Sequence, residues 1–468
     1  MHVKRLANHR RPLPRRQVVS SVNAIDPQLA PARLLGVTSL AHFLNDGVVF
    51  FIPVIGDLLS QDHHVSIAIV TAMLTVFYLA SASFGVAVGL LADAIGRRGP
   101  MIATGIATLG ISLLGFYASL SLTGIPSDAL VLVAAFVAGI GSSFYHPLGG
   151  SVLQLGFPKS SRGKALGVNG AAGSLGRALY PTLFFVIAAI GISRPATTVV
   201  FAVLSLLAAT VVAVGLPAGR SAPGARRRAM RKPGLPPPGG SQGAAASKEL
   251  VPPATAIPGA TSSSTSTSLR SLLSRSVLVL MGISYFRSLA FIGIVSWIPI
   301  YLTTERHAGL STGLGWTVTV MYAGGIVGQP LFGLLSDRFD KRVMLALDSL
   351  GSAASIWLFL STAGHGVGAL LALAVFGLFT FSGFPLLLSL VADYVPKESS
   401  TTGNALVWGV GSTGGQAIGP LAASLLMRGS HAHLGSAFAI LGAVAAATVV
   451  ATPLLQRTVR SGRIALFG

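Results

Sequence analysis

Asp46 and His42 are the residues whose types and spacing most directly suggest chemistry in this 468-residue chain. They lie four residues apart in one apolar stretch, so a helix would place both on one face together with Asn45. At about 1.5 Å per residue, Asp46 lies roughly 18 Å into the stretch, near the middle of a hydrocarbon layer about 30 Å thick. An acid at that depth must be paired or protonated. The pair therefore predicts a proton-binding site with Asp46 as proton carrier, and the alternative is a structural carboxylate satisfied by neighbouring helices.

His146 is a second candidate for proton coupling. It directly precedes Pro147 deep within a later apolar stretch. A proline weakens the local helix and frees a backbone carbonyl for a polar partner. His146 is thus expected to relay protons or contact substrate, or only to satisfy the broken turn, and the sequence leaves these alternatives open.

Arg177 and Arg287 are two arginines placed about ten to fifteen residues inside apolar stretches, too deep to reach the membrane surface easily. They belong to opposite halves of the chain, which would let them converge on one central cavity. Guanidinium groups bind phosphonate, phosphate or carboxylate in a forked geometry. This predicts an anionic or zwitterionic ligand, and the rival hypothesis is that one or both arginines permanently neutralise Asp46.

Other polar side chains extend the predicted substrate site. Each could instead hydrogen-bond or pack against a neighbouring helix. The candidates are Asn45, Tyr145, Asn169, Gln329 and Gln416. Asp348, in contrast, is expected to pair with Arg338 or Lys341 at a helix end.

The composition indicates the elements that must position these groups. Hydrophobic residues make up 52% of the chain and charged residues only 10%, whereas soluble domains carry about 25% charged residues. The mean hydropathy is +0.73, and the 56 glycines suit close helix contacts in lipid. The chain is therefore predicted to be an all-α membrane protein. Stretches of about 20 apolar residues predict twelve spanning helices at 34–59, 67–92, 100–120, 129–156, 163–191, 196–216, 277–302, 314–336, 342–362, 366–392, 402–427 and 433–455.

The distribution of charge predicts the topology. The net charge is +20, and nearly all Lys and Arg residues fall in the segments that would face the cytoplasm if both termini did. The prediction is a multi-pass protein of the cell membrane with both termini cytoplasmic. Because topology accounts for the positive charge, no nucleic-acid partner is expected, and the expected partners are the lipid bilayer, a small-molecule substrate and protons.

The same pattern divides the chain into five segments. These are a cytoplasmic basic arm (1–33), an N-terminal six-helix bundle (34–216), a cytoplasmic linker (217–275), a C-terminal six-helix bundle (276–456) and a cytoplasmic tail (457–468). The linker is rich in Ala, Pro, Gly, Ser and Thr and is predicted to be disordered. The chain has no cysteine, which excludes disulfides and thiol-ligated metals.

Short strings recur in the two halves in the same order. Residues Gly89–Arg98 read G-L-L-A-D-A-I-G-R-R, and residues Gly333–Arg342 read G-L-L-S-D-R-F-D-K-R. Ile52-Pro53 likewise corresponds to Ile298-Pro299. This internal repetition predicts two pseudo-symmetric six-helix bundles with a ligand site between them at mid-membrane.

These loop strings resemble the signature of the major facilitator superfamily, and the resemblance covers nearly all of the chain outside the arm, linker and tail. An acid at a helix end can pair with loop arginines and with the positive end of a neighbouring helix, which would hold one of two access states. The alternative is that the arginines only anchor the topology. The gate residues would be Asp93, Arg97, Arg98, Asp337 and Arg338.

Within that superfamily the chain resembles the fosmidomycin resistance protein group. The resemblance rests on L-A-H-F-L-N-D at 40–46, G-S-S-F-Y-H-P at 141–147, and Arg162-Gly163 with the glycines that follow. It implies export of a phosphonate-like drug.

Taken together, these features predict a proton-coupled secondary transporter working by alternating access, and not an enzyme. The primary prediction is that protonation of Asp46 and substrate binding compete, which makes the carrier an antiporter exporting a small anionic or zwitterionic drug or metabolite. If they are additive, it is a proton symporter for uptake of an organic or phosphorylated anion. No P-loop string, H-E-x-x-H string or carboxylate cluster suggests ATP, a cofactor or a metal, and the carrier is expected to function as a monomer.

Overall fold

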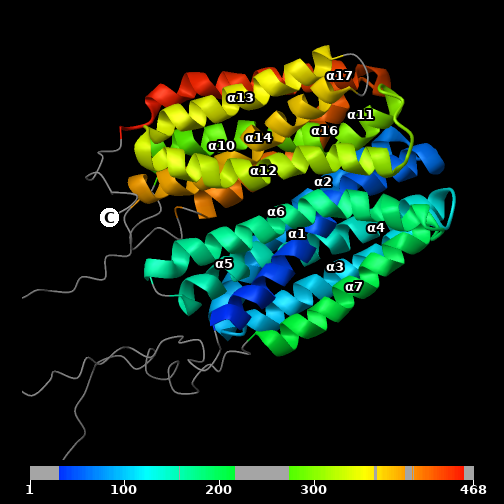
Figure 1. The fold of residues 1–468 in the computed structure, drawn as a ribbon, viewed down its shortest axis with the longest axis horizontal. Coiled ribbons are helices and arrows are strands. Elements are labelled where there is room, and N and C mark those ends of the chain that lie inside the picture. The colour runs from blue at the N-terminus through cyan, green and yellow to red at the C-terminus, as the bar shows by residue number, and fades with distance from the viewer. Residues whose placement is uncertain are drawn as a thin grey trace, which may run out of the picture.

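The computed structural model describes residues 31–157, 159–216, 273–362, 366–395, 403 and 405–457, and within these ranges the chain forms helices and loops without a strand (Figure 1). The N-terminal helices are α1 (Pro31–Asp62), α2 (Ile67–Ile95), α3 (Arg98–Leu120), α4 (Ile125–Ser142), α5 (Tyr145–Gly156), α6 (Lys159–Ala189) and α7 (Arg194–Gly215). The C-terminal helices are α10 (Arg275–Val295), α11 (Ile298–Thr304), α12 (Thr312–Arg338), α13 (Lys341–Ser361), α14 (Val367–Tyr394), η2 (Ala405–Thr413), α16 (Gly414–Leu426), η3 (His431–His433), α17 (Leu434–Ala447) and η4 (Thr448–Leu454).

The predicted spans correspond to these helices. Ten spans in the described part are long and apolar enough to cross a membrane, and α14 and the η2–α16 segment occupy the other two predicted spans. Apolar side chains such as Val214, Ile190 and Val450 are 74%, 75% and 80% exposed, as expected for a surface that faces lipid. The predicted arm, linker and tail lie almost entirely outside the described residues.

Three predicted spans are interrupted. The span predicted at 129–156 breaks at Ser143 and Phe144 into α4 and α5, and the span predicted at 277–302 breaks at Ser296 and Trp297 into α10 and α11. In both cases a proline follows close behind the break, and a proline lacks the N–H that would continue the helix. The eleventh span begins as the π-helix η2, a rare form that often marks functional segments.

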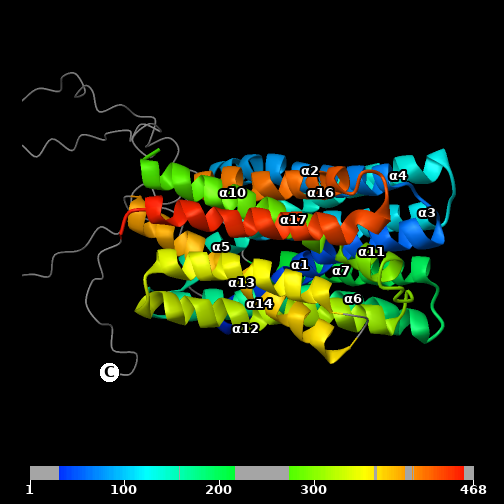
Figure 2. The same ribbon diagram turned by 90° about the horizontal axis from the view of Figure 1, so that it is seen from above.

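The helices form two bundles, α1 to α7 and α10 to η4, which lie side by side (Figure 1). Helix α6 packs along α12, and α2 packs along α16 (Figure 2). Glycines permit the closest approaches within each bundle. A Cβ at Gly176 of α6 would collide with the Phe43 carbonyl of α1, and one at Gly415 of α16 would collide with the Tyr285 carbonyl of α10.

The two ends of the molecule differ in charge. We call the end at which α1 begins, holding Arg33, Arg98, Arg275 and Arg342, the basic end, and the end at which α1 finishes at Asp62 the far end. Hydrogen bonds between the bundles run from the middle to the far end in the described part of the chain. They join Thr71 to Ser424, Thr182 to Thr319, Gln61 and Asp57 to Thr303, Arg194 to Leu310, Phe50 to Tyr322, Ala178 to Thr319, and Ser174 to Gln329. The bundles are thus joined at the far end.

Candidate functional site

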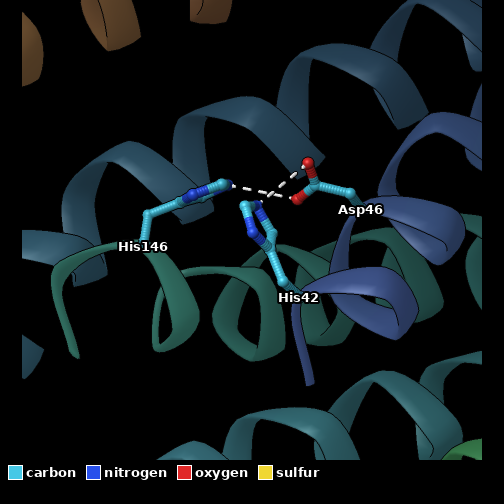
Figure 3. Close-up of side chains that lie close together, drawn as sticks. All are labelled: His42, Asp46 and His146. Atoms are coloured by element: carbon cyan, nitrogen blue, oxygen red, sulfur yellow. Dashed lines mark ion pairs between the residues drawn. The ribbon is translucent and has the colours of Figure 1, made fainter. Parts of the chain in front are cut away.

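Asp46 lies halfway along α1 and is fully buried. Its Oδ2 accepts from Arg177 Nη1 at 2.9 Å and lies 3.3 Å from His42 Nε2. Its Oδ1 accepts from Asn45 Nδ2 at 3.0 Å and lies 3.5 Å from His146 Nε2 (Figure 3). The structure therefore brings together four of the predicted site residues around the carboxylate that the sequence singled out.

The orientation of His42 requires a proton between it and Asp46. His42 Nδ1 lies 2.8 Å from the backbone carbonyl oxygen of Asn169, and a carbonyl only accepts, so Nδ1 must be the protonated nitrogen. In a neutral ring Nε2 would then be a bare acceptor facing a carboxylate oxygen. A single proton on Nε2 or on Oδ2 turns this repulsive contact into a hydrogen bond. The contact therefore has the geometry of a pair that can share one proton.

Tyr145 and Asn169 hold His42 in this orientation. The Tyr145 ring stacks on the His42 ring with centroids 4.6 Å apart. The Tyr145 hydroxyl donates to the Thr38 carbonyl at 2.9 Å and accepts from Asn169 Nδ2 at 2.9 Å. Both residues, predicted as substrate contacts, are buried and engaged in this network.

Arg177 lies where the two bundles meet. Its Nη2 donates to Ser174 Oγ at 2.7 Å, and its guanidinium lies 5.2 Å from the ring centroid of Phe50 and 4.9 Å from that of Phe381. Phe50 belongs to α1 and Phe381 to α14, so the cation is held by one aromatic face from each bundle. Such a cation–π clamp orients the guanidinium without neutralising its charge.

His146 is the most exposed residue of the cluster around Asp46. It lies in the first turn of α5, and its side chain is 47% exposed while that of Asp46 is 1% exposed. His146 lies directly after the break between α4 and α5, and its ring points toward Asp46 (Figure 3). An exposed imidazole in contact with a buried carboxylate can pass a proton inward.

Arg287 does not share this site. It forms a buried ion pair with Asp348 of α13 and donates to the Thr380 carbonyl of α14 at 2.8 Å. The expectation that Asp348 pairs with Arg338 or Lys341 is therefore wrong, because Asp348 points into the C-terminal bundle, and Lys341 instead binds Asp393 at 2.6 Å. Each of the two arginines is therefore paired with an acid of its own bundle.

The remaining predicted residues are dispersed. Gln329 of α12 donates to Ser174 Oγ at 3.4 Å, across the bundle interface and beside Arg177. Gln416 is half-buried on α16, with no hydrogen-bond partner among the described residues. Arg97 is exposed and Arg98 half-buried at the start of α3. The side chains of Asp93, Asp337 and Arg338, predicted as gate residues, lie outside the described part of the structure.

Sequence reasoning missed the aromatic clamp and Ser174. Phe50 lies four residues after Asp46 and Ser174 three residues before Arg177, and these helical spacings were the available signals. Phe381 had no such signal, because its contact with Arg177 joins α14 to α6.

The cluster has the donor set of a two-histidine, one-carboxylate metal site. The ligand atoms of His42, Asp46 and His146 lie within 4.8 Å of one another. The Arg177 guanidinium, however, binds the same carboxylate, and its positive charge opposes a cation there. The arrangement fits a proton better than a metal ion.

Comparison with known proteins places this geometry in context. The family model described as Major Facilitator Superfamily matches residues 37–314 and 307–464. The chain is 31% identical over 140 residues to the glucose-6-phosphate exchanger SLC37A1 of Mus musculus, covering 28% of this chain and 26% of that protein. It is 31% identical over 146 residues to the multidrug resistance protein MdtG of Citrobacter koseri, covering 29% of this chain and 34% of that protein. The chain thus aligns with only about a quarter to a third of these relatives.

Solved structures show the same fold at low identity. An inward open conformation of the xylose transporter XylE from E. coli superposes with a TM-score of 0.66 at 14% identity, covering 91% of this chain and 96% of that one. A bacterial homolog of the human lysosomal transporter Spinster gives a TM-score of 0.62 at 15% identity, covering 91% and 95%.

Proposed function

The chain belongs to the major facilitator superfamily, and on that premise we propose that it is a secondary transporter that couples proton movement to the passage of a small anionic or zwitterionic solute. The observation that carries the proposal is the Asp46 cluster. The fully buried carboxylate of Asp46 is bound by Arg177 and faces the imidazoles of His42 and His146. The His42 ring is oriented so that it can share a proton with this carboxylate. Intramembrane groups of this kind mark proton and substrate pathways in transporters.

Arg177 is the proposed anion-binding group. Arg177 Nη1 forms an ion pair with Asp46 Oδ2 at 2.9 Å. A solute anion must therefore displace the Asp46 carboxylate to bind the guanidinium. Protonation of the His42–Asp46 contact weakens the internal competitor and frees the guanidinium. Proton and anion then bind additively, which supports symport of an organic or phosphorylated anion. The glucose-6-phosphate exchanger among the relatives is named for a phosphorylated anion.

Antiport is the second candidate, and a different feature favours it. The rings of Phe50 and Phe381 lie against the Arg177 guanidinium, which suits an amphipathic solute. A zwitterion with a cationic group would bind Asp46 in place of the proton, and such competition drives export against inward proton flow. The resemblance of the sequence to the fosmidomycin resistance group and the name of the multidrug resistance protein among the relatives favour this alternative.

The proposed orientation follows the charge distribution. With the basic end in the cytoplasm, the hydrogen bonds that join the bundles run from mid-membrane to the outer side, and we propose that the Asp46 cluster opens toward the inner side. The proposal includes both termini on the cytoplasmic side of the cell membrane and function as a monomer.

Proteoliposomes with an imposed pH gradient test the proposal. Accumulation of labelled glucose-6-phosphate or a short phosphonate driven by an inward proton gradient supports symport, and export stimulated by inward proton flow supports antiport. Arg177→Gln should abolish anion transport while Arg428→Gln, at an exposed position in the turn after α16, should retain it. Transport by Arg177→Gln at the wild-type rate would remove the anion hypothesis.

A further inference from the structure

A second buried carboxylate lies on the same face of α1 as Asp46. Asp57 follows Asp46 by eleven residues, which is about three helical turns and about 16 Å toward the far end. It is fully buried. Asp57 is not part of the cluster around Asp46.

The partner of Asp57 belongs to the other bundle. Asp57 Oδ1 lies 2.6 Å from Thr303 Oγ1 of α11, and Gln61 Nε2 donates to the same hydroxyl at 3.2 Å. Asp57 Oδ2 is buried without any hydrogen-bond partner. The carboxyl group therefore depends on one hydroxyl across the bundle interface.

No cation compensates Asp57 in the described part of the chain. Asp62 is the charged group that acts on it, and Asp62 is itself paired with Arg194 of α7 at 2.7 Å. The adjoining part of α2 brings the apolar residues Val70 and Met73 against the α1 turn that holds Gly56.

The charged residues after α11 are also engaged elsewhere. Arg306 donates to the Phe359 carbonyl of α13 at 3.0 Å. Glu305 accepts from the backbone N–H of Gly435 at 2.9 Å. Neither group is bound to Asp57, so α11 contributes a hydroxyl and no charge to its surroundings.

A carboxylate buried with a single donor and no cation is costly, and protonation removes that cost. Building on the carrier function proposed above, we propose that Asp57 is a second proton-binding site, which binds a proton when the far end closes and releases it when the far end opens.

The contacts of Thr303 accommodate the neutral acid. A protonated Asp57 Oδ1 donates to Thr303 Oγ1, and the threonine hydroxyl in turn donates to the Ile300 carbonyl, 3.0 Å away. Every hydroxyl hydrogen then has an acceptor. When the bundles separate at the far end, α11 carries Thr303 away, water reaches Asp57, and the ionised form becomes stable.

In this proposal Asp57 is protonated in the conformation whose far end is closed. Acidic solution on the far side favours closure, and neutral or alkaline solution favours opening. The α1 helix would thus carry one proton site at mid-membrane and one at the interface that must open for alternating access.

Spin-label distances at the far end test this proposal without any solute. The chain has no cysteine, so Ser121→Cys and Ser311→Cys introduce the only thiols at two exposed positions, one in each bundle. Double electron–electron resonance on the labelled protein in nanodiscs then reports the opening of the far end between pH 5 and pH 9. We expect the long-distance population to rise severalfold with pH.

Variants separate Asp57 from its neighbours. Asp57→Asn, a neutral isostere, should keep the short distance at every pH. Asp62→Asn, an acid at the same end, should respond like the parent protein. Thr303→Val should move the transition to lower pH, because the protonated acid of the closed state loses its acceptor across the bundle interface, and this variant retains the test if Asp57→Asn does not fold.

An unchanged pH response in Asp57→Asn, or loss of the response in Asp62→Asn, would overturn the proposal. So would a parent protein whose distances do not change with pH. Asp46→Asn in the same labelled background should keep the response, so a failure of solute coupling at Asp46 and a failure of the Asp57 site give different results.

Discussion

Asp46→Asn offers the most direct measure of how the proton and the solute anion are coupled. The substitution preserves the shape of the side chain and removes the charge that binds Arg177 Nη1 at 2.9 Å. Two unit charges about 4 Å apart interact by about 4 kcal/mol at an effective dielectric constant of about 20. Desolvation offsets part of this attraction, and coupling free energies between sites are about 1–3 kcal/mol, or about 5–150-fold in affinity.

We therefore expect Asp46→Asn to bind an anion about tenfold to a hundredfold tighter than the wild-type protein at alkaline pH. Wild-type affinity should increase as the pH falls, because protonation releases Arg177 from its internal partner. The affinity of the variant should be independent of pH. In proteoliposomes the variant should retain exchange of solute for solute but lose accumulation driven by a pH gradient.

Equilibrium binding of a radiolabelled alkyl sulfonate to protein in nanodiscs is a suitable assay, because the charge of a sulfonate is constant across the pH range. Labelled glucose-6-phosphate gives the comparison with a phosphorylated anion. Arg177→Gln serves as the matched control and should show no specific binding. If Asp46→Asn binds the sulfonate more weakly than wild type at alkaline pH, or keeps the wild-type pH dependence, the competition between Asp46 and the solute for Arg177 is refuted.

Three further predictions concern stability, each measured by thermal unfolding of the purified protein. Asp348→Asn should destabilise the protein by about 3–5 kcal/mol because it leaves Arg287 charged and buried, and a wild-type melting temperature would contradict the buried ion pair. Gly176→Ala should cost about 1–3 kcal/mol because its Cβ meets the α1 backbone, whereas Gly167→Ala, with open space around it, should be tolerated. Asp340 is the N-cap of α13 at the basic end. Hydrogen bonds from the Arg342 side chain lower the pKa of the Asp340 carboxyl below its usual value. Its stabilisation is present above the ordinary carboxyl pKa and lost as the pH falls through the lowered one, so Asp340→Ala should cost about 1 kcal/mol near neutral pH and remove that acid-side decline.

Several features of this protein followed from local sequence. A backbone in lipid must satisfy its own hydrogen bonds, so long apolar stretches become helices whatever their neighbours. This is why the helices lie where hydropathy placed them, and why Asp46 could be located at mid-membrane from its position in α1 alone. The spacing of His42, Asn45 and Asp46 likewise determined that they share one face.

Other features depended on contacts between distant segments. Asp348 was assigned to a helix end from its position near Lys341, yet the packing of α13 against α14 and α17 turned it toward Arg287 of α10. Asp57 escaped notice because its significance rests on Thr303, which lies 246 residues away. The breaks in two spans and the π-helix η2 were also invisible to hydropathy, which measures how apolar a stretch is and not how its backbone bends.

The sequence by itself determined which segments enter the membrane, which ionisable groups are carried into it and that the chain repeats. Only the tertiary structure decided which charges meet, joining Arg177 to Asp46 across 131 residues and Arg287 to Asp348. The reason is physical. The depth of a residue follows from counting along its own helix, whereas its partner depends on how helices rotate and tilt as side chains and glycines far apart in the chain pack together.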